Sequence, residues 1–287
     1  MPDLVLPQHH CVDTDRHDPG DRACWWRARR HHGLDGLTAS FRRHRYAPHS
    51  HDTYVVGVIV SGCEVYNLRG ERRVAAAGSL NLIDPGEVHD GAPLEDGFSY
   101  RMTYPAPALL ADLANEAGLG HTAPHFPEPV VDDPLAAAAL LRAHRILEGG
   151  GDPLAGDEAL LQAMTLILRR HGDFRIGDTR PPARSEAAVA RVRDYLETCF
   201  DTAPELAELA AIAGLSRHHL LRLFKRETGL TPHAYLTDCR VRAARRLLAE
   251  GRTPTEVALA CGFYDQSHLN RAFKQRTGSA PGAYRAA

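Results

Sequence analysis

The chain has 287 residues, of which 44% are hydrophobic, and its formal net charge at pH 7 is −2. This length suits two domains of common size, and the near-neutral charge argues against a protein that coats polyanions without selectivity. No apolar run approaches the roughly 18 residues that cross a bilayer, and the first residues show no signal-peptide pattern. Six cysteines without CxxC spacing indicate reduced thiols, so we expect a cytoplasmic protein with no membrane partner.

The segment from Leu34 to Tyr104 predicts β-structure. Short runs of β-branched and aromatic residues alternate there with turn signals such as Gly62, Gly78 and Pro85-Gly86. We expect strands at 38–46, 54–60, 63–68, 72–76, 80–83 and 98–104. Many short strands between glycine turns indicate a sandwich or a small barrel. Residues 1–33 lack this pattern and are expected to form an irregular N-terminal arm.

From residue 105 to 171 the pattern becomes helical. Helices are expected at 108–117, 135–147 and 157–170, and the last places Leu160, Leu161, Met164, Ile167 and Leu168 on one broad face. Such helices either cover the barrel or form a dimer interface, and we favour a homodimer. Residues 172–184, with Gly177 and Pro181-Pro182, predict an interdomain linker.

The last third of the chain contains the same helix-turn-helix unit twice. Up to Gly214 and Gly262 the copies lie 48 positions apart, and from Leu220 and Leu269 onward they lie 49 apart. The second turn therefore carries one extra residue. Self-similarity of this kind identifies a repeated structural unit. Local signals agree, because Gly214 suits a turn, Ser216 suits a helix N-cap, and Thr253 with Glu256 predicts a capping box.

The second helix of each unit has one apolar and one polar side. The apolar sides carry Leu220, Leu223 and Phe224 in the first copy, and Leu269 and Phe273 in the second. A helix-turn-helix places its second helix in the major groove, where arginine pairs with guanine and Gln or Asn pairs with adenine. The alternative for one copy is an ordinary helical hairpin with a solvated charged face, and two matching copies argue against it.

Residues 185–287 resemble the DNA-binding domain of AraC/XylS-type transcriptional regulators. The resemblance covers the whole segment and includes the phrases Leu220-Leu-Arg-Leu-Phe-Lys225, Arg245-Arg-Leu-Leu-Ala249 and Ala260-Cys-Gly-Phe263. It implies an all-α domain in which one long helix, here 232–249 between Thr231 and Gly251, joins two helix-turn-helix units.

The same resemblance implies which residues contact DNA. These residues are His218, Leu221, Arg222, Lys225, Gln266, Ser267, Asn270, Arg271 and Lys274. Leu221 departs from the polar residue often found at its position, so it contacts a thymine methyl group or only packs. Charge agrees with this assignment, since residues 185–287 carry 15 Lys and Arg against 11 Asp and Glu, whereas residues 1–184 carry 19 against 25.

The N-terminal half resembles a cupin, a small jelly-roll barrel. His49-Ser-His51 followed by Gly62 is similar to the first cupin motif, and Gly78 followed by Pro85-Gly86-Glu-Val-His89 is similar to the second. In AraC-type regulators a barrel of this kind is the usual N-terminal sensor of a small-molecule effector. The resemblance therefore implies an effector pocket, for which the candidate residues are His49, His51, Tyr54 and His89.

Metal-binding cupins supply two histidines and a glutamate from the first motif and one histidine from the second. His49, His51 and His89 are only weak metal candidates, because the glutamate position falls at Val55 or Val56. We therefore expect no metal and no other cofactor. The histidines then either line the effector pocket or hold the barrel mouth together by hydrogen bonds.

These observations predict a two-domain α+β protein. A cupin-like β-barrel with trailing helices (34–171) binds effector and dimerises, and an all-α double helix-turn-helix domain (185–287) binds DNA. We expect no enzyme but a sequence-specific transcription regulator whose partners are double-stranded DNA, a small-molecule effector, a second copy and, for an activator, RNA polymerase. The alternatives are a metal-dependent cupin enzyme fused to a DNA-binding domain, and a DNA binder that responds to no ligand.

Overall fold

The structure is a computed structural model that describes residues 20–29, 31–150, 153–174 and 184–286. Its N-terminal half contains an eight-stranded antiparallel sheet in the order β1-β2-β7-β4-β6-β8, with β3 paired to β7 and β5 paired to β4. The strands are β1 (Arg22–Ala28), β2 (Leu34–Phe41), β3 (Tyr46–His49), β4 (Val55–Leu68), β5 (Glu71–Ala76), β6 (Leu80–Ile83), β7 (His89–Tyr104) and β8 (Val130–Val131).

The two longest strands, β4 and β7, bend the sheet into its barrel-like form. The expected strands 54–60 and 63–68 are one strand, β4, whose pairing with β7 shifts register between Ile59 and Ser61 and again between Gly62 and Glu64. Gly62 has a φ of +70°, and a Cβ atom there would lie 2.1 Å from the carbonyl oxygen of Gly97. Only glycine fits this bulge, which increases the local twist and curvature.

Part of the expected irregular arm is in fact a strand. Residues 22–28 form β1, which pairs with β2 in continuous register from Arg22 opposite Ser40 to Ala28 opposite Leu34. Trp25 and Trp26 are both buried, so packing of two aromatic rings stabilises a strand whose alternation is obscured by the surrounding arginines. The rest of the expected arm, residues 1–19 and Arg30, lies outside the described residues.

Three helices cover one face of the sheet: α1 (Pro107–Glu116), α2 (Pro134–Glu148) and α3 (Pro153–His171). Their apolar sides meet one set of alternate β4 and β6 side chains in a core that includes Val56, Val58, Leu80, Leu82, Leu110, Leu140, Met164 and Ile167. The buried Asp133 carboxylate accepts hydrogen bonds from the N-terminal turn of α2 and from Arg170 and His171 at the end of α3. All three expected helices are thus confirmed; α1 has the predicted length shifted by one residue, and α2 and α3 are longer than predicted.

The C-terminal half is all helical. It contains α4 (Arg184–Thr198), α5 (Leu206–Ala213), α6 (Arg217–Thr228), α7 (Pro232–Ala249), α8 (Pro254–Ala260), α9 (Gln266–Thr277) and α10 (Pro281–Ala286). Helices α5 and α6 form the first helix-turn-helix unit, α8 and α9 form the second, and α7 joins them. The expected two-domain α+β fold is confirmed, while α4 and α10 had not been predicted as separate helices. No helix in the described part of the chain is long and apolar enough to cross a membrane.

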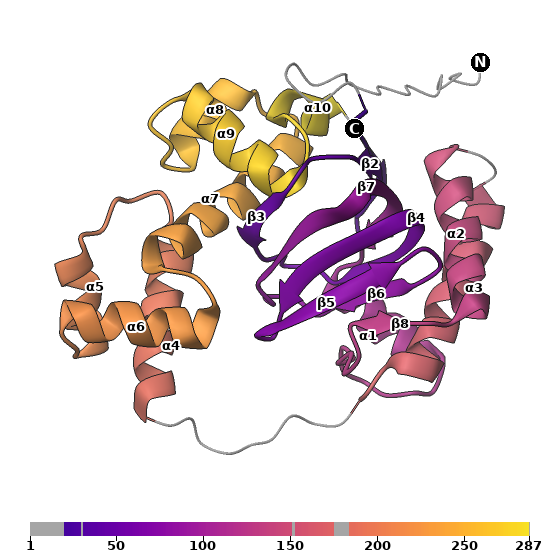
Figure 1. The fold of residues 1–287 in the computed structure, drawn as a ribbon, viewed down its shortest axis with the longest axis horizontal. Coiled ribbons are helices and arrows are strands. Elements are labelled where there is room, and N and C mark those ends of the chain that lie inside the picture. Colours follow the sequence, from indigo (N-terminus) through magenta and orange to yellow (C-terminus); the bar gives the residue numbers. More distant parts are fainter. Residues whose placement is uncertain (1–19, 30, 151–152, 175–183, 287) are drawn as a thin grey trace.

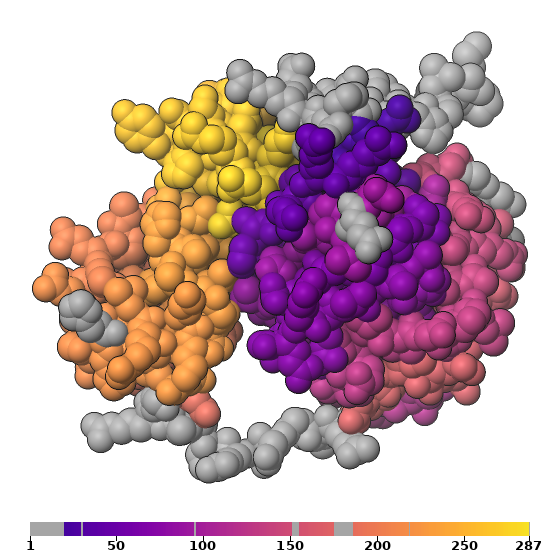
Figure 2. Space-filling view, viewed as in Figure 1, coloured from indigo at the N-terminus to yellow at the C-terminus, as the bar shows by residue number. Residues whose placement is uncertain are grey.

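The C-terminal helices belong to two different hydrophobic cores. One core contains α4, α5, α6 and the start of α7, with Leu220 and Phe224 at its centre. The other combines the second face of the sheet, including Trp25 and Phe41, with Phe273 and Tyr284 of α9 and α10. Figure 1 shows α7 and α9 lying beside β3 and α10 lying near β2, and Figure 2 shows the first helix-turn-helix unit standing farther from the sheet. The second unit and the sheet therefore share one core.

Truncation of a central aromatic ring should destabilise each C-terminal core separately. Phe224 and Phe273 are both fully buried, so we expect Phe224→Ala and Phe273→Ala each to lower the free energy of unfolding by about 3–5 kcal/mol. Urea denaturation followed by circular dichroism measures this change. Tyr264→Ala is the control, because a side chain that is 90% exposed should contribute less than about 0.5 kcal/mol. An unchanged unfolding midpoint in both phenylalanine variants would contradict this description of the cores.

Candidate functional site

Helix α6 presents the first predicted reading surface. Gly214 ends α5 in the left-handed conformation, with a φ of +67°, and the Ser216 hydroxyl caps α6 by accepting a hydrogen bond from the His219 amide. On the side away from the core, Arg222 and Lys225 are exposed and Leu221 is half-buried. The side chain of His218 lies outside the described part of the structure.

Helix α9 presents the second predicted reading surface. Gln266, Ser267 and Arg271 are exposed, whereas Asn270 and Lys274 are half-buried. The Gln266 Oε1 atom accepts a hydrogen bond of 3.0 Å from the Thr255 hydroxyl, which connects α9 to α8.

The turn before α9 exposes an aromatic residue that the sequence analysis did not select. Tyr264 is 90% exposed in the turn that carries the extra residue of the second copy. A tyrosine hydroxyl can donate a hydrogen bond to a phosphate oxygen. The position of Tyr264 beside a reading helix is therefore compatible with a contact to the DNA backbone. The length difference between the two copies was the available signal.

Helix α7 holds the two units in a fixed relation. The expected caps are present, since the Thr231 hydroxyl accepts from the Ala234 amide and Thr253 forms a capping box with Glu256. Arg240, in the middle of α7, is buried and donates to the carbonyl oxygens of Phe200 (2.8 Å) and Thr202 (2.6 Å). These charge-assisted bonds fasten the segment between α4 and α5 to α7.

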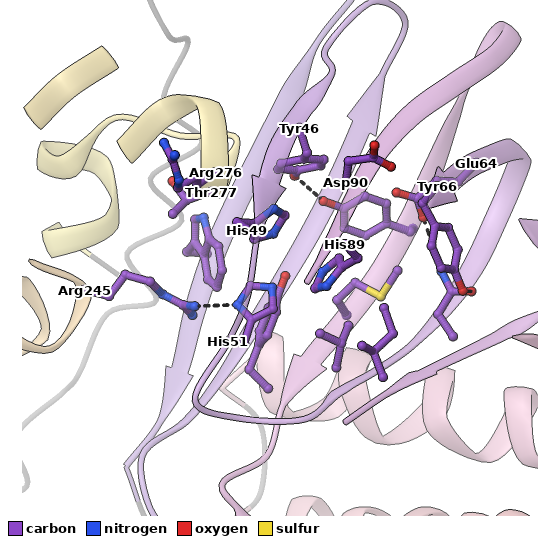
Figure 3. A pocket seen from close by; sticks show the side chains of 17 residues that line it. Tyr46, His49, His51, Glu64, Tyr66, His89, Asp90, Arg245, Arg276 and Thr277 are labelled. Carbon is purple, nitrogen blue, oxygen red and sulfur yellow. Dashed lines mark hydrogen bonds between the residues drawn. The ribbon is translucent and has the colours of Figure 1, made fainter. Parts of the chain in front are cut away.

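A pocket lies between the sheet and helices α7 and α9, at the barrel mouth (Figure 3). Three of the four predicted effector residues meet there, and all three are buried. The ring centroids of His49 and His89 are 4.5 Å apart, those of His49 and His51 are 4.8 Å apart, and those of His51 and His89 are 5.1 Å apart. β3 ends at His49 and His51 lies just beyond it, yet both rings reach the pocket.

The structure does not bring Tyr54 into this cluster. Its ring packs edge-on against Phe126, and its hydroxyl donates to the carbonyl oxygen of Pro124. Tyr54 belongs to the core beneath α1 to α3, on the opposite face of the sheet. A position just before β4 was compatible with either face, and the side-chain alternation along β4 decides which one is used.

The pocket histidines are held in their neutral form. Burial lowers the pKa of His49 and His51 well below the usual value, and the neighbouring histidines and arginines lower it further. The Nδ1 atoms of His49 and His89 lie 2.8 Å and 3.0 Å from the carbonyl oxygens of Ala47 and Glu87, so both rings donate from Nδ1. Their Nε2 atoms are consequently acceptors.

His51 has the opposite tautomer. A guanidinium nitrogen of Arg245 lies 3.0 Å from His51 Nδ1 and can only donate to it, so a neutral His51 carries its proton on Nε2.

The pocket suits a resident metal ion poorly. His49, His51 and His89 bring ligand atoms within 4.8 Å of one another, and three imidazoles suit zinc, iron or nickel. However, the Nδ1 atom of His51 accepts a hydrogen bond from Arg245, and the position at which metal-binding cupins carry a glutamate falls at Val55 or Val56. The guanidinium groups of Arg245 and Arg276 also line the cavity. Their positive charges disfavour a cation and favour an uncharged or anionic occupant.

Arg245 is the α7 residue that lines the pocket at the barrel mouth. Its guanidinium carbon lies 5.2 Å from the ring centroids of Trp25 and Tyr104 and 5.5 Å from that of Tyr284. The group also contacts His51 and lies 3.5 Å from the Asp35 carboxylate. A guanidinium surrounded by aromatic faces and paired with a carboxylate keeps its charge even when water is largely excluded.

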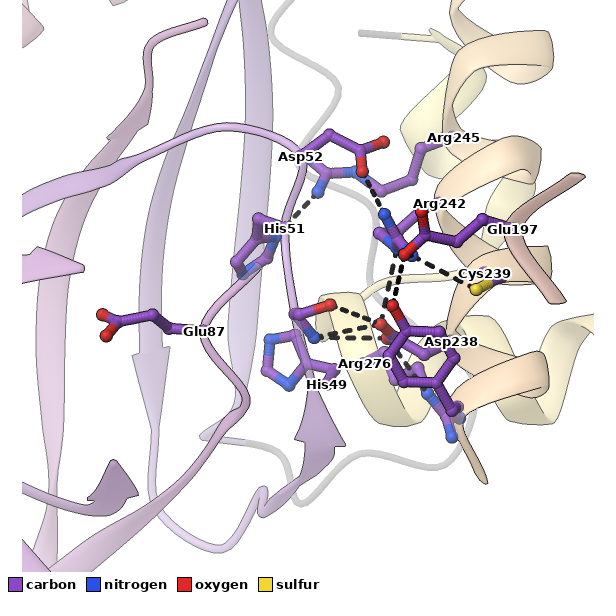
Figure 4. A network of polar contacts seen from close by, with 12 residues as sticks. His49, His51, Asp52, Glu87, Glu197, Asp238, Cys239, Arg242, Arg245 and Arg276 are labelled. Atoms are coloured by element: carbon purple, nitrogen blue, oxygen red, sulfur yellow. Dashed lines mark hydrogen bonds and ion pairs between the residues drawn. The ribbon is translucent and has the colours of Figure 1, made fainter. Parts of the chain in front are cut away.

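A second set of polar contacts connects α7 to the loop that follows β3 (Figure 4). The buried Asp238 carboxylate accepts hydrogen bonds from the Ser50 hydroxyl at 2.7 Å and from the Ser50 amide at 3.2 Å. Asp52 pairs with Arg242 and with Arg246. Every one of these contacts joins the two domains, so the loop 50–52 is held by α7 rather than by the barrel alone.

Two pocket groups are poorly compensated. Arg276 of α9 is 8% exposed, and its Nε atom has no hydrogen-bond partner among the described residues. The Asp238 carboxylate lies 3.7 Å from this atom and also forms an ion pair with Arg242. Burial accordingly lowers the pKa of Arg276, and Asp238 only partly offsets this effect.

Glu64 is the second of these groups. It is buried and accepts a 3.2 Å hydrogen bond from Asn81, and burial raises its pKa to about 8.

The residues that sequence reasoning missed here are Arg245, Arg276 and Glu64. Arg245 lies in a phrase that supported the resemblance to regulators, but nothing local to it indicates contact with His51, which is 194 positions away. Glu64 lies on a strand where alternation gave no sign of a functional carboxylate. Each becomes recognisable only once the second helix-turn-helix unit packs on the sheet.

Comparisons with known proteins identify both domains. A family described as AraC-like ligand binding domain matches residues 31–164, and a family described as helix-turn-helix domain matches residues 209–287. An uncharacterized HTH-type transcriptional regulator of Bacillus subtilis, YbfI, is 29% identical over 230 residues, which cover 78% of this chain and 81% of YbfI. The chain belongs to the AraC family of transcriptional regulators.

Further members of the AraC family agree in sequence and in fold. The HTH-type transcriptional activator RhaS of Yersinia pestis is 24% identical over 234 residues, covering 78% of this chain and 83% of RhaS. The apo form of a ToxT variant from Vibrio cholerae shares the fold with a TM-score of 0.56 at 13% identity, covering 88% of this chain and 97% of ToxT. Wild-type ToxT bound to an unsaturated fatty acid gives a TM-score of 0.53 at 12% identity, with coverage of 88% and 94%.

The protein is therefore a DNA-binding transcription regulator that responds to a small-molecule effector. Its N-terminal domain is of the AraC-like ligand-binding type, and its C-terminal domain is the DNA-binding one.

Acid should weaken this regulator through the pocket histidines. Because the pKa of His51 in the folded protein is lowered, the unfolded chain binds the proton first, and stability falls as pH drops below about 6.5. The groups facing His51 are His49, His89, Arg245 and Tyr104. We expect the melting temperature of the wild type to fall more between pH 7 and pH 5.5 than that of His51→Gln.

The comparison with His51→Gln is needed because Glu64 titrates in the opposite sense. Its raised pKa makes the folded protein more stable as pH falls from about 8, in both proteins alike. Equal pH slopes for the wild type and His51→Gln, measured by differential scanning fluorimetry, would contradict a neutral buried His51.

Proposed function

We propose that this regulator reads its operator with the exposed sides of α6 and α9. The observation that carries this proposal is that Arg222 and Arg271 occupy corresponding places in the two units and are both exposed. Lys225, Gln266, Ser267, Asn270 and Lys274 surround them as further DNA contacts, together with His218 and Leu221. The half-buried Leu221 fits an apolar contact with a thymine methyl group.

We also propose that the effector binds in the pocket lined by His49, His51 and His89. This pocket is built from both domains, because Arg245 and Arg276 belong to the DNA-binding domain while the histidines belong to the sensor. A ligand that contacts both domains has a different affinity for each of their relative arrangements. It can therefore shift the arrangement, and with it the affinity for DNA.

The size of the pocket supports coupling between the domains. Its volume is about 40 Å³, whereas an engineered cavity that holds benzene measures about 150 Å³. An effector of more than a few non-hydrogen atoms can enter only if α7 or α9 moves away from the barrel mouth. Effector entry and domain movement would then be the same event.

The proposed organisation consists of an N-terminal segment (1–33), an effector-binding and dimerisation domain (34–171), a linker (172–184) and a DNA-binding domain (185–287). We propose a homodimer formed by α2 and α3, because Leu135 and Leu161 on these helices are 63% and 44% exposed. A cytoplasmic location and, for an activator, contact with RNA polymerase complete this proposal.

The proposal excludes catalysis, since the pocket suits a metal ion poorly and the relatives are transcriptional regulators. The alternative, a metal-dependent cupin enzyme fused to a DNA-binding domain, makes a different demand. It requires stoichiometric metal in the purified protein and loss of that metal in His49→Ala, both of which elemental analysis measures.

Loss of one reading arginine should weaken operator binding selectively. We expect Arg222→Ala and Arg271→Ala each to cost about 1–3 kcal/mol of binding free energy on operator DNA, if each makes a bidentate contact with guanine. Sequencing of genomic fragments bound by the protein provides the operator, and fluorescence anisotropy measures the affinity. Arg226→Ala is the control on the same helix, because Arg226 lies outside the predicted reading set and pairs with Glu227. An equal loss on operator and random DNA would show that these arginines contact only phosphate.

The dimer proposal is tested without DNA. We expect light scattering coupled to size-exclusion chromatography to give twice the chain mass for the wild type, and a monomer for Leu161→Lys, because a charge at an apolar interface is costly to bury. Val74→Lys is the matched control, since Val74 is 52% exposed on β5, away from α2 and α3. A monomeric wild type at micromolar concentration would contradict dimerisation in solution.

A further inference from the structure

The two poorly compensated groups of the pocket lie at opposite ends of it. In Figure 3, Arg245 and Arg276 approach from the helices on one side, and Glu64 lies with Tyr66 on the other side, beyond the three histidines. A buried ionisable group without full pairing costs free energy, so such groups are informative where they face a cavity.

At the end of the pocket formed by the helices, the positive charge of Arg276 is not fully paired. Asp238 cannot fully satisfy Arg276, because it lies 3.7 Å from Arg276 Nε and also accepts two hydrogen bonds from Ser50 and pairs with Arg242. Arg245, the other guanidinium in the pocket, donates to the neutral His51 and already lies 3.5 Å from the Asp35 carboxylate, so the missing partner is that of Arg276 Nε. A carboxylate placed between Arg245 and Arg276 would supply the missing partner at short, charge-assisted distances.

The sheet end contains a buried carboxyl group whose hydrogen bonds are incomplete. The Glu64 carboxyl receives a 3.2 Å hydrogen bond from Asn81, and the nearby charge is the like charge of Asp90 rather than a cation. Burial raises the pKa of this carboxyl to about 8, with Asp90 raising it further and Asn81 lowering it. A ligand hydroxyl would exchange hydrogen bonds with the protonated Glu64 carboxyl, and an ammonium group would pair with its ionised form, whereas a methyl group would leave Glu64 without a further partner.

We infer that the effector is a small carboxylic acid whose far end carries a hydrogen-bond donor, a hydroxyl or an ammonium group. The carboxylate pairs with Arg245 and Arg276, the donor faces Glu64, and the histidine rings lie between them. The pocket volume of about 40 Å³ favours a short chain, and a molecule of more than a few non-hydrogen atoms enters only with the movement of α7 or α9 proposed above. This inference rests on the proposed function, because it assumes that the effector occupies this pocket.

The test uses matched short acids and the full-length protein. The probes are glycolate, 3-hydroxypropanoate and 4-hydroxybutanoate, the amino acids glycine, β-alanine and 4-aminobutanoate, and the plain acids acetate, propanoate and butanoate. Isothermal titration calorimetry at pH 7 measures each dissociation constant. We expect at least one donor-bearing acid to bind at least tenfold more tightly than the plain acid of the same chain length, because the plain acid leaves Glu64 unpaired.

Variants at each end assign the two halves of the ligand. Arg276→Gln should weaken the best probe at least tenfold, whereas Arg246→Gln should not, because Arg246 pairs with Asp52 outside the pocket. Glu64→Leu should reduce the preference over the plain acid to about twofold or less. Glu64→Gln should abolish binding of an ammonium-bearing acid but retain a hydroxy acid, because the amide oxygen still accepts a hydrogen bond. Melting curves of each variant show that it is folded before it is titrated.

Several outcomes would overturn the inference. They are the absence of binding by every probe, equal affinity for plain and donor-bearing acids, and equal losses in Arg276→Gln and Arg246→Gln. The proposed function fails separately. If the wild type binds operator DNA but none of the acids, only the ligand class is wrong. If no genomic fragment is enriched with or without the acids, the regulatory function itself is in question.

Discussion

The arrangement of this regulator depends on one buried guanidinium group. Arg245 stands on α7 and enters a ring of Trp25, Tyr104 and Tyr284, where it contacts His51 and the Asp35 carboxylate. No apolar side chain could replace it without leaving His51 and Asp35 without this partner. Because α7 also joins the two helix-turn-helix units, this contact, together with those of Asp238 and Asp52, orients both reading helices with respect to the sensor.

The contact between the domains is specific but need not be strong. Buried ion pairs lose much of their Coulomb energy to desolvation, so contacts such as Asp35 with Arg245 fix geometry more than they add stability. A contact of this kind suits a regulator, because a modest difference in ligand affinity is enough to change the balance between two arrangements. The same buried charges would penalise a partly open state in which one partner remains unpaired.

Local features of the fold were predictable from the sequence, whereas the pocket was predictable only in part. The capping residues Ser216, Thr231 and Thr253 and the three helices after the sheet depend on short-range signals. Strand β1 was missed because burial of Trp25 and Trp26 is decided by distant partners. Motif spacing brought His49, His51 and His89 together correctly, but Tyr54 faces the other core, and alternation near a bulged strand did not settle its direction.

The two halves of the DNA-binding domain have different neighbours. Phe224 lies in a core made mainly of C-terminal helices, whereas Phe273 and Tyr284 complete the core of the sensor sheet. The composition of the linker places the domain boundary at residues 172–184. Packing places the weaker boundary elsewhere, because the second helix-turn-helix unit shares a core with the sensor sheet. A hybrid protein that joined this sensor to another regulator's DNA-binding domain would expose the apolar face of the sensor sheet unless α7, α9 and α10 were kept. Exchange of domains between relatives is thus constrained by a surface that lies far from either the operator or the linker.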